Sequence, residues 1–264
     1  MTSATEKTLI LRDGQLTTKV YVRGDGPPLV FLHGEFGVKW DSFLEDLSNS
    51  FTVYAPLHPG LTEPEDIRRL ETLWDLVLYH YELFDALELQ SPAVIGHSYG
   101  GMLAAELAAT NPDRVSKLII MSALGFWRDD KPIADWTAMP REDLIKLSFY
   151  EPEGDIAKSV TAEPEDEEMR KDELINATWA QACAGKFTWP IPDKGLKHRI
   201  HRVKAPTMVI WGENDGVVDP VYAREFVGRM GNAKVALKLV GQAAHMPHLE
   251  RRQHVVGLIE QFLT

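Results

Sequence analysis

The sequence contains very little cysteine and no long hydrophobic run. Cys183 is the single cysteine among 264 residues, so no disulfide can form within the chain. Such a chain suits a reducing compartment, and we expect a cytoplasmic protein in which Cys183 acts as a small buried hydrophobic residue. The first residues, Met-Thr-Ser-Ala-Thr-Glu-Lys-Thr, lack the basic and apolar segments of a signal peptide. No segment approaches the about 18 uninterrupted apolar residues of a membrane span.

Positive charge is in the minority. Lysine and arginine number 28 against 39 aspartates and glutamates, which gives a formal net charge of −11 at pH 7. Nucleic acids and anionic membranes would be repelled by such a surface, so we expect neither as a partner. A small neutral or cationic molecule is easier to accommodate. The composition, 44% hydrophobic and 25% charged, is typical of a globular protein and leaves the oligomeric state open.

The most informative stretch is residues 93–108, where an apolar run ends in Gly-His-Ser-Tyr-Gly and continues as an Ala/Leu-rich helical pattern. A buried strand, a tight turn and a helix in this order predict a nucleophile elbow. Glycine is required at both ends of the turn, because a side chain at Gly96 or Gly100 would collide with the neighbouring strand or helix. Ser98 is then a candidate nucleophile at a helix N-terminus, where the backbone N–H of Tyr99 is free to donate to an oxyanion.

Outside this stretch, strands alternate with helices. The segments 9–12 and 17–22 predict an antiparallel hairpin at one edge of the sheet. The alternation that follows predicts an α/β fold, a mostly parallel twisted sheet with helices on both faces. The expected strands besides the apolar run before the elbow are 29–32, 51–55, 115–121, 205–211 and 234–240. The expected helices include a long amphipathic one over 66–87, then 221–230 and 251–263.

Residues 123–200 break this alternation. They hold four of the seven tryptophans, and their acidic stretch 162–168 is typical of a helix start. We interpret the segment as a helical lid inserted into a core formed by residues 1–122 and 201–264. Aromatic residues in such a segment more often pack within it than contact a ligand. The candidates for substrate contact are Trp127, Trp136, Trp179 and Trp189, together with Met246 beyond the segment.

A nucleophilic serine needs a base, and the base needs a carboxylate that orients it and stabilises its charged form. Asp215 lies in the turn after a buried strand, where a carboxylate can reach the active face. Asp219 precedes a proline and is typical of a helix N-cap, which favours Asp215 as the acid. Among the histidines that follow, His245 lies in a loop, whereas His248 begins the last helix and His254 lies inside it. His245 is therefore the predicted base.

The second oxyanion donor is expected in the turn after the 29–32 strand, where His33-Gly34 precedes Glu35 and Phe36. We assign this donor to the backbone N–H of Glu35, with Phe36 as the alternative. The side chain of Glu35 is of interest in itself. A carboxylate beside an oxyanion hole opposes the developing charge unless it is neutral, paired or turned away. His33 is expected to brace this loop.

Together, His33-Gly34, the 96–101 elbow, Gly-Glu-Asn-Asp at 212–215 and Ala-His-Met-Pro at 244–247 resemble the α/β-hydrolase superfamily. The resemblance covers the chain apart from the 123–200 segment. It implies a catalytic triad of Ser98, Asp215 and His245, an oxyanion hole from Tyr99 and either Glu35 or Phe36, and no metal or organic cofactor. Haloalkane dehalogenases and epoxide hydrolases are relatives with an aspartate nucleophile, and Ser98 argues against both.

The resemblance favours a serine hydrolase that cleaves an ester or lactone of a small, mainly apolar substrate through an acyl-enzyme on Ser98. The alternatives are carbon–carbon bond hydrolysis, perhydrolysis, or ligand binding without turnover on a hydrolase scaffold. Ring-cleavage carbon–carbon hydrolases usually carry a His-Gly-Gly-Gly-Pro-Gly turn and a tryptophan after the catalytic histidine. This chain has His-Gly-Glu-Phe-Gly at 33–37 and Met246 instead, so carbon–carbon bond hydrolysis is less favoured than ester or lactone cleavage.

Overall fold

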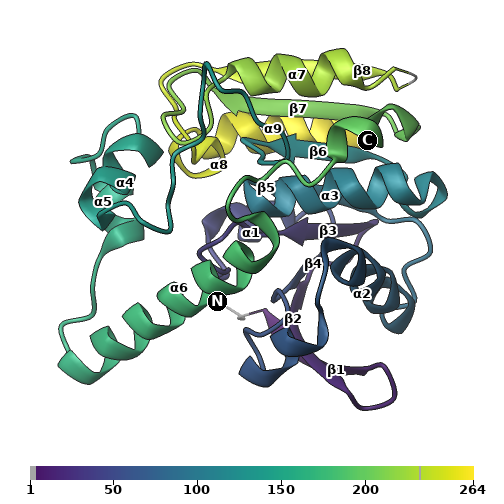
Figure 1. The fold of residues 1–264 in the computed structure, drawn as a ribbon, viewed down its shortest axis with the longest axis horizontal. Helices are drawn as coiled ribbons and strands as arrows, with labels where there is room; N and C mark the ends of the chain where they lie inside the picture. The colour runs from purple at the N-terminus through teal and green to yellow at the C-terminus, as the bar shows by residue number, and fades with distance from the viewer. Residues whose placement is uncertain (1–3, 232) are drawn as a thin grey trace.

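The computed structural model describes residues 4–231 and 233–264. Over these residues the strands form one eight-stranded sheet in the order β1-β2-β4-β3-β5-β6-β7-β8. Neighbouring strands from β4 through β3 to β8 run parallel, and the β1–β2 hairpin adds antiparallel strands at one edge, as predicted (Figure 1). The strands are β1 Thr5–Leu11, β2 Leu16–Arg23, β3 Pro28–Leu32, β4 Thr52–Pro56, β5 Ala93–His97, β6 Leu118–Met121, β7 Thr207–Gly212 and β8 Val235–Val240.

Helices cover both faces of the sheet, because side chains along each central strand point alternately to opposite sides. Val94 and Ile120 pack in the larger hydrophobic cluster with helices α2, α3 and α7, whereas Ile95 and Ile119 pack in a second cluster with α1 and α9. The predicted α/β fold is thus confirmed. The helices of the two layers are α1 Ser42–Leu47, α2 Leu73–Ala86, α3 Tyr99–Thr110, α7 Val221–Arg229 and α9 Arg252–Leu263, and the short α8 Pro247–Glu250 precedes α9.

The long helix expected over 66–87 is wrong as a single element. The chain forms a 3₁₀ helix, η1 Pro64–Arg69, passes through an extended Leu70, and begins α2 only at Leu73. A capping box starts α2, in which the side chains of Thr72 and Asp75 each accept the other's backbone N–H. Asp66 is also held by a distant contact, since its carboxylate accepts the backbone N–H of Thr17 at 2.7 Å. These local and tertiary hydrogen bonds override the apolar periodicity.

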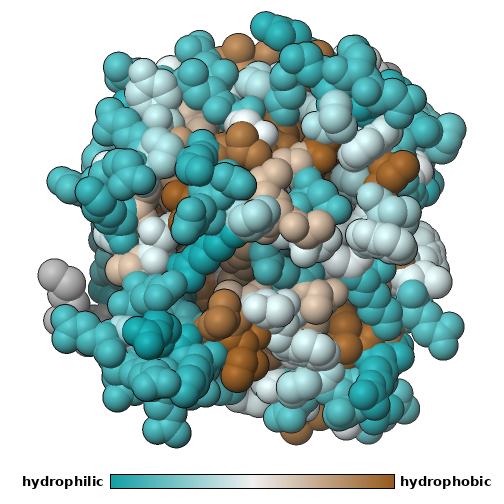
Figure 2. Space-filling model, turned by 60° about the vertical axis from the view of Figure 1, so that its left-hand side comes forward, coloured by the Kyte–Doolittle hydropathy of each residue, from teal (hydrophilic) through white to brown (hydrophobic). Residues whose placement is uncertain are grey.

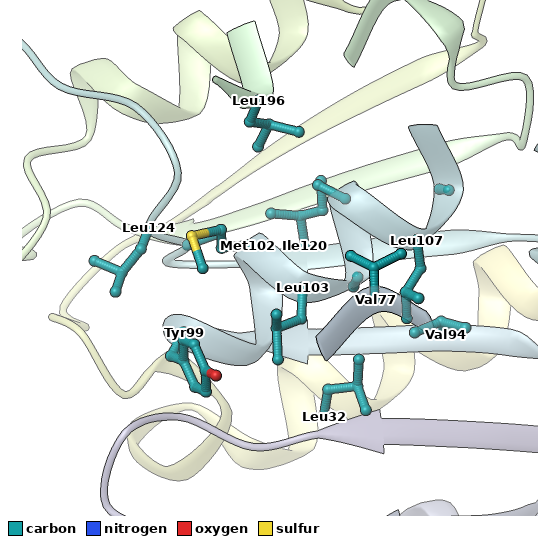
Figure 3. Packing of buried hydrophobic residues seen from close by; sticks show 14 of the residues in the cluster. Leu32, Val77, Val94, Tyr99, Met102, Leu103, Leu107, Ile120, Leu124 and Leu196 are labelled. Atoms are coloured by element: carbon teal, nitrogen blue, oxygen red, sulfur yellow. The ribbon is translucent and has the colours of Figure 1, made fainter. Parts of the chain in front are cut away.

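Between β6 and β7 the chain forms three helices that stand at one end of the sheet (Figure 1). The longest of them, α6, begins after Asp166, whose carboxylate accepts two backbone N–H groups of the first turn, as the acidic stretch predicted. Further on, Leu196 is fully buried against α3, near Met102 (Figure 3). The elements here are α4 Arg141–Ser148, α5 Asp155–Thr161, α6 Glu167–Thr188, η3 Leu196–His198 and η4 Ile200–Arg202, and η2 Pro112–Arg114 precedes β6.

Candidate active site

Ser98 occupies the sharp turn between β5 and α3, with φ 52° and ψ −117°. A β-carbon on Gly96 would lie 2.2 Å from the carbonyl oxygen of Gly100, and one on Gly100 would lie 2.0 Å from the carbonyl oxygen of Leu32 in β3. Both contacts are with backbone atoms that cannot move aside. The expected need for glycine at these two positions is confirmed, and the serine is held in a strained conformation of the kind found at functional turns.

The structure brings Ser98, His245 and Asp215 together in one hydrogen-bonded chain. The Oγ of Ser98 lies 3.0 Å from Nε2 of His245, and Nδ1 of His245 lies 3.0 and 3.1 Å from the two carboxylate oxygens of Asp215. A carboxylate only accepts, so Nδ1 carries the imidazole proton and Nε2 is free to accept from the serine hydroxyl. All three residues are buried. This arrangement is able to withdraw a proton from Ser98.

The carboxylate of Asp215 is fixed by the turn that carries it. Its Oδ1 accepts the backbone N–H groups of Val217 and Val218 at 3.0 and 2.9 Å. Asp219 instead faces the next helix, because its carboxylate accepts the backbone N–H of Val221 at 2.9 Å. The capping role expected of Asp219 is present, although Pro220 is the residue that immediately precedes α7.

Two carboxylates set the charge state of His245. Burial alone lowers the pKa of an imidazole. Here that effect is outweighed by the attraction and hydrogen bond of Asp215 and by the nearby carboxylate of Glu35, so the pKa of His245 is raised above its ordinary value. The charged form of the His245 imidazole is therefore stabilised.

The loop that carries His245 is held by residues that the sequence analysis did not single out. The ring Nε2 of His97 donates to the carbonyl oxygen of His245 at 2.8 Å, and the backbone N–H of His245 donates to the carbonyl of Ser148 at the end of α4. The carboxylate of Glu250 accepts the N–H of Ala244 at 2.7 Å. A histidine directly before the elbow serine and a glutamate five residues after His245 were the available signals.

A second group of buried histidines braces the turn after β3, as expected of His33. The backbone N–H of His58 donates to Nε2 of His33, so Nδ1 of His33 is protonated and donates to the carbonyl of Gly34 at 2.7 Å. The Nε2 of His58 returns a hydrogen bond to the His33 carbonyl at 2.8 Å. Burial lowers the pKa of His33 to about 4, which keeps its ring neutral.

The braced turn lies directly against Ser98. A β-carbon on Gly34 would lie 3.4 Å from Cβ of Ser98. The next residue, Glu35, is buried, whereas the side chain of Phe36 is 37% exposed. Oxyanion donation by the N–H groups of Tyr99 and of Glu35 or Phe36 remains a prediction, as do the roles of the triad residues.

The candidate substrate-contact residues lie at different places. Trp127, Trp136 and Trp189 line one cleft. Its other lining residues are Ile133, Ala134, Asp135, Thr137, Thr188, Pro190 and Pro192. Trp179 of α6 instead donates from its indole N–H to the carbonyl of Gly60 at 2.8 Å. Figure 2 shows apolar side chains gathered amid hydrophilic ones on the face toward the α4–α6 end. Met246 is half-buried just after His245. Substrate contact by these five residues remains a prediction.

The described residues contain neither a metal-binding cluster nor a membrane-spanning helix. Residues 4–231 and 233–264 contain no group of three or more histidine, cysteine, aspartate or glutamate side chains placed to hold a metal ion. Within the same ranges, the helices are too short or too polar to cross a bilayer. Cys183 is buried and unpaired, as expected.

Comparison with known proteins identifies the family. A model of the alpha/beta hydrolase family matches residues 29–257. The chain belongs to this family. It is 27% identical to a 2-hydroxy-6-oxononadienedioate/2-hydroxy-6-oxononatrienedioate hydrolase of Pseudomonas putida over the whole of both chains. It is 23% identical to the pimeloyl-[acyl-carrier protein] methyl ester esterase of Aliivibrio fischeri, over 94% of this hydrolase-family chain and 99% of the esterase.

The solved structures agree on the fold. The meta-cleavage product hydrolase CumD from Pseudomonas fluorescens IP01 superposes with a TM-score of 0.75 at 19% identity, over 97% of each chain. At this identity the match shows the shared architecture and leaves the substrate of this family member open.

Proposed function

We propose that this alpha/beta hydrolase cleaves a carboxylic ester or lactone of a small, mainly apolar molecule through an acyl-enzyme on Ser98. The observation that carries the proposal is the hydrogen-bonded chain from Asp215 through His245 to Ser98 at the elbow. A hydroxyl aligned with a neutral imidazole nitrogen at 3.0 Å is the arrangement that acyl transfer requires. The 123–200 segment acts as the lid over this site, and we place the enzyme in the cytoplasm, which the single unpaired Cys183 supports.

In the first half of the reaction, Nε2 of His245 takes the proton from Ser98 as Oγ attacks the substrate carbonyl carbon. The negative charge moves to the carbonyl oxygen, which the N–H of Tyr99 and that of Glu35 or Phe36 stabilise. The imidazolium then passes its proton to the leaving oxygen as the bond from the acyl carbon breaks. Asp215 keeps its negative charge throughout and stabilises the imidazolium.

In the second half, His245 removes a proton from water, whose oxygen attacks the acyl carbon. The proton returns to Oγ as the bond between Ser98 and the acyl group breaks, and the carboxylic acid leaves. No redox partner or cofactor takes part in this sequence.

Carbon–carbon bond hydrolysis is the second candidate. It is supported by the Pseudomonas putida relative, whose name describes hydrolysis of a hydroxy-oxo-dienedioate, and by a second relative from Pseudomonas sp. (strain CF600) that is named 2-hydroxymuconate semialdehyde hydrolase. The same three residues serve either reaction. Against it stand Glu35 and Met246, which replace the glycine-rich turn and the tryptophan usual in that group.

The test is hydrolysis of nitrophenyl esters of acyl groups from acetate to octanoate, in parallel with a 2-hydroxy-6-oxo-dienoate. We expect ester turnover that falls by several powers of ten in Ser98→Ala and in His245→Ala, since triad residues act as a unit. Dienoate turnover without ester turnover would transfer the assignment to carbon–carbon hydrolysis. Near-full activity in either variant would overturn the proposed nucleophile or base.

A further inference from the structure

Glu35 is a buried acid whose carboxylate accepts no hydrogen bond from the residues that the structure describes. Its side chain is 2% exposed, and neither carboxylate oxygen has a hydrogen-bond partner among the described residues. Burying a carboxyl group without a partner carries a large free-energy cost, so such groups are usually satisfied by protein, water or ligand. An unpaired acid is therefore a signal that something outside the chain completes the site.

The position of Glu35 is inside the candidate active site. It follows Gly34, which lies against Ser98, and its carboxylate acts electrostatically on the imidazole of His245. Helix α6 passes over this turn, since a β-carbon on Gly37 would lie 4.0 Å from Cβ of Ala180. The acid is thus enclosed between the nucleophile and the inserted helices.

The carboxylate of Asp215 places a second acid in the same site as Glu35. Asp215 and Glu35 are both acids, and both act on His245. The other imidazoles of this region stay neutral, because burial lowers the pKa of His97 well below its usual range and that of His248 to about 3. A positively charged group entering the site would therefore be attracted and would satisfy the acceptor oxygens of Glu35.

We propose that Glu35 is a specificity residue that binds a protonated amine carried by the substrate on the acyl side of the scissile carbonyl. This inference rests on the proposed function of Ser98. An ammonium group supplies only donors, which match the acceptor-only carboxylate. A second carboxylate on the substrate would be repelled, so the site disfavours half-esters of dicarboxylic acids.

A hydroxyl group would satisfy one carboxylate oxygen but leave the charge unbalanced. During attack the proton moves from Ser98 to His245, while a new negative charge appears on the carbonyl oxygen, so the net charge of the site is unchanged. The negative charges of Asp215 and Glu35 are therefore still unbalanced. This charge balance favours an amine over a neutral donor.

The experiment compares three nitrophenyl esters of nearly equal shape, which carry a β-alanyl, a butyryl or a succinyl acyl group. We expect wild-type kcat/KM to be higher for the β-alanyl ester than for the butyryl ester by about tenfold or more, the effect of one charge-assisted hydrogen bond. Glu35→Gln keeps the side-chain shape and removes the charge. It should bring the two rates to within about threefold and raise the relative rate on the succinyl ester.

Ser98→Ala supplies the background rate for each ester, and Glu71→Gln, at an exposed glutamate, is the matched charge control. The same preference in wild type and Glu35→Gln would overturn the assignment of Glu35. Absence of Ser98-dependent turnover on every ester would instead count against the proposed function. Calorimetry then measures the binding of β-alaninamide to the Ser98→Ala variant and to the Ser98→Ala/Glu35→Gln double variant. The comparison tests whether Glu35 binds the amine. Binding that weakens at least fivefold with Glu35→Gln supports it, and equal binding overturns it.

Discussion

The carboxylate of Glu250 accepts the backbone N–H of Tyr150, which lies 100 positions earlier in the chain, at 2.7 Å. Its other oxygen accepts the N–H of Ala244, next to His245. One side chain therefore joins the inserted segment between β6 and β7 to the loop that carries the proposed base. The geometry of His245 depends on how this segment is seated.

Replacement of Glu250 by glutamine should lower kcat/KM for ester hydrolysis by about tenfold. The amide has a single acceptor oxygen, so one of the two backbone N–H groups faces an NH₂ group and loses its partner. Steady-state kinetics on the best nitrophenyl ester measure the effect. Glu260→Gln is the control, because Glu260 accepts a hydrogen bond from Ser50 at the surface, and it should stay within about twofold of wild type. Equal activities of the two variants would contradict the positioning role.

The pH profile should reveal the two acids beside His245. Their attraction raises the pKa of His245 against the opposing effect of burial, and only the neutral imidazole can accept the proton of Ser98. Activity should therefore fall as pH decreases through a midpoint above the ordinary histidine value of about 6.5. Glu35→Gln removes one attraction and should move the midpoint of kcat/KM toward acid. A midpoint that stays in place would show that Glu35 does not act on the base.

Many residues of this site can be proposed from the sequence, because short sequence patterns indicate where each of them lies. The elbow requires small residues at Gly96 and Gly100, and buried strands show themselves as short apolar runs. Loop position after a strand favours Asp215 over Asp219 and His245 over its neighbours. Asp215 and His245 are the pair that the structure joins by a hydrogen bond. Each of these sequence signals lies within a short stretch of chain.

What could not be read from the sequence depends on contacts between distant segments. The link from Glu250 to Tyr150 spans 100 residues, and the hydrogen bond from His97 to the carbonyl of His245 spans 148. The break between η1 and α2 also depends in part on a distant contact, because the carboxylate of Asp66 accepts the backbone N–H of Thr17 in β2. The spacing of apolar residues predicts which face of a helix or strand is buried. It does not predict hydrogen bonds between a side chain and a distant backbone group.

The glycines of the elbow provide a stability test. Gly100→Ala places a β-carbon 2.0 Å from the carbonyl oxygen of Leu32, so β3 and α3 must separate, and we expect loss of folded protein or of several kcal/mol of unfolding free energy. Gly228→Ala is the matched control. Gly228 lies in α7, and a β-carbon there meets no atom of the described residues within 4 Å outside the adjacent helix backbone. Helix propensity predicts a gain of about 0.5–1 kcal/mol. Urea denaturation followed by tryptophan fluorescence measures both, and a stable, active Gly100→Ala would contradict the close packing of the elbow.

Buried neutral histidines should make the protein sensitive to mild acid. The ring of His80 donates from Nδ1 to the carbonyl of Leu76 at 2.8 Å and leaves Nε2 buried without a partner, and burial lowers its pKa to about 4. Because the unfolded chain takes up this proton below about pH 6.5 and the folded chain does not, unfolding free energy is lost as pH falls from 6.5 toward 4. Each such histidine contributes up to about 1.4 kcal/mol per pH unit in that window.

His80→Gln should therefore flatten the fall in unfolding free energy between pH 7 and pH 5, whatever its effect on stability at pH 7. The comparison is the difference between the two pH values within each variant, measured by urea denaturation, so a general loss of packing cancels. His254→Gln serves as the control because His254 is exposed on α9, and it should keep the wild-type slope. If His80→Gln also keeps that slope, the acid sensitivity arises elsewhere. Other buried histidines with a lowered pKa, His33 and His248 among them, then become the groups to replace.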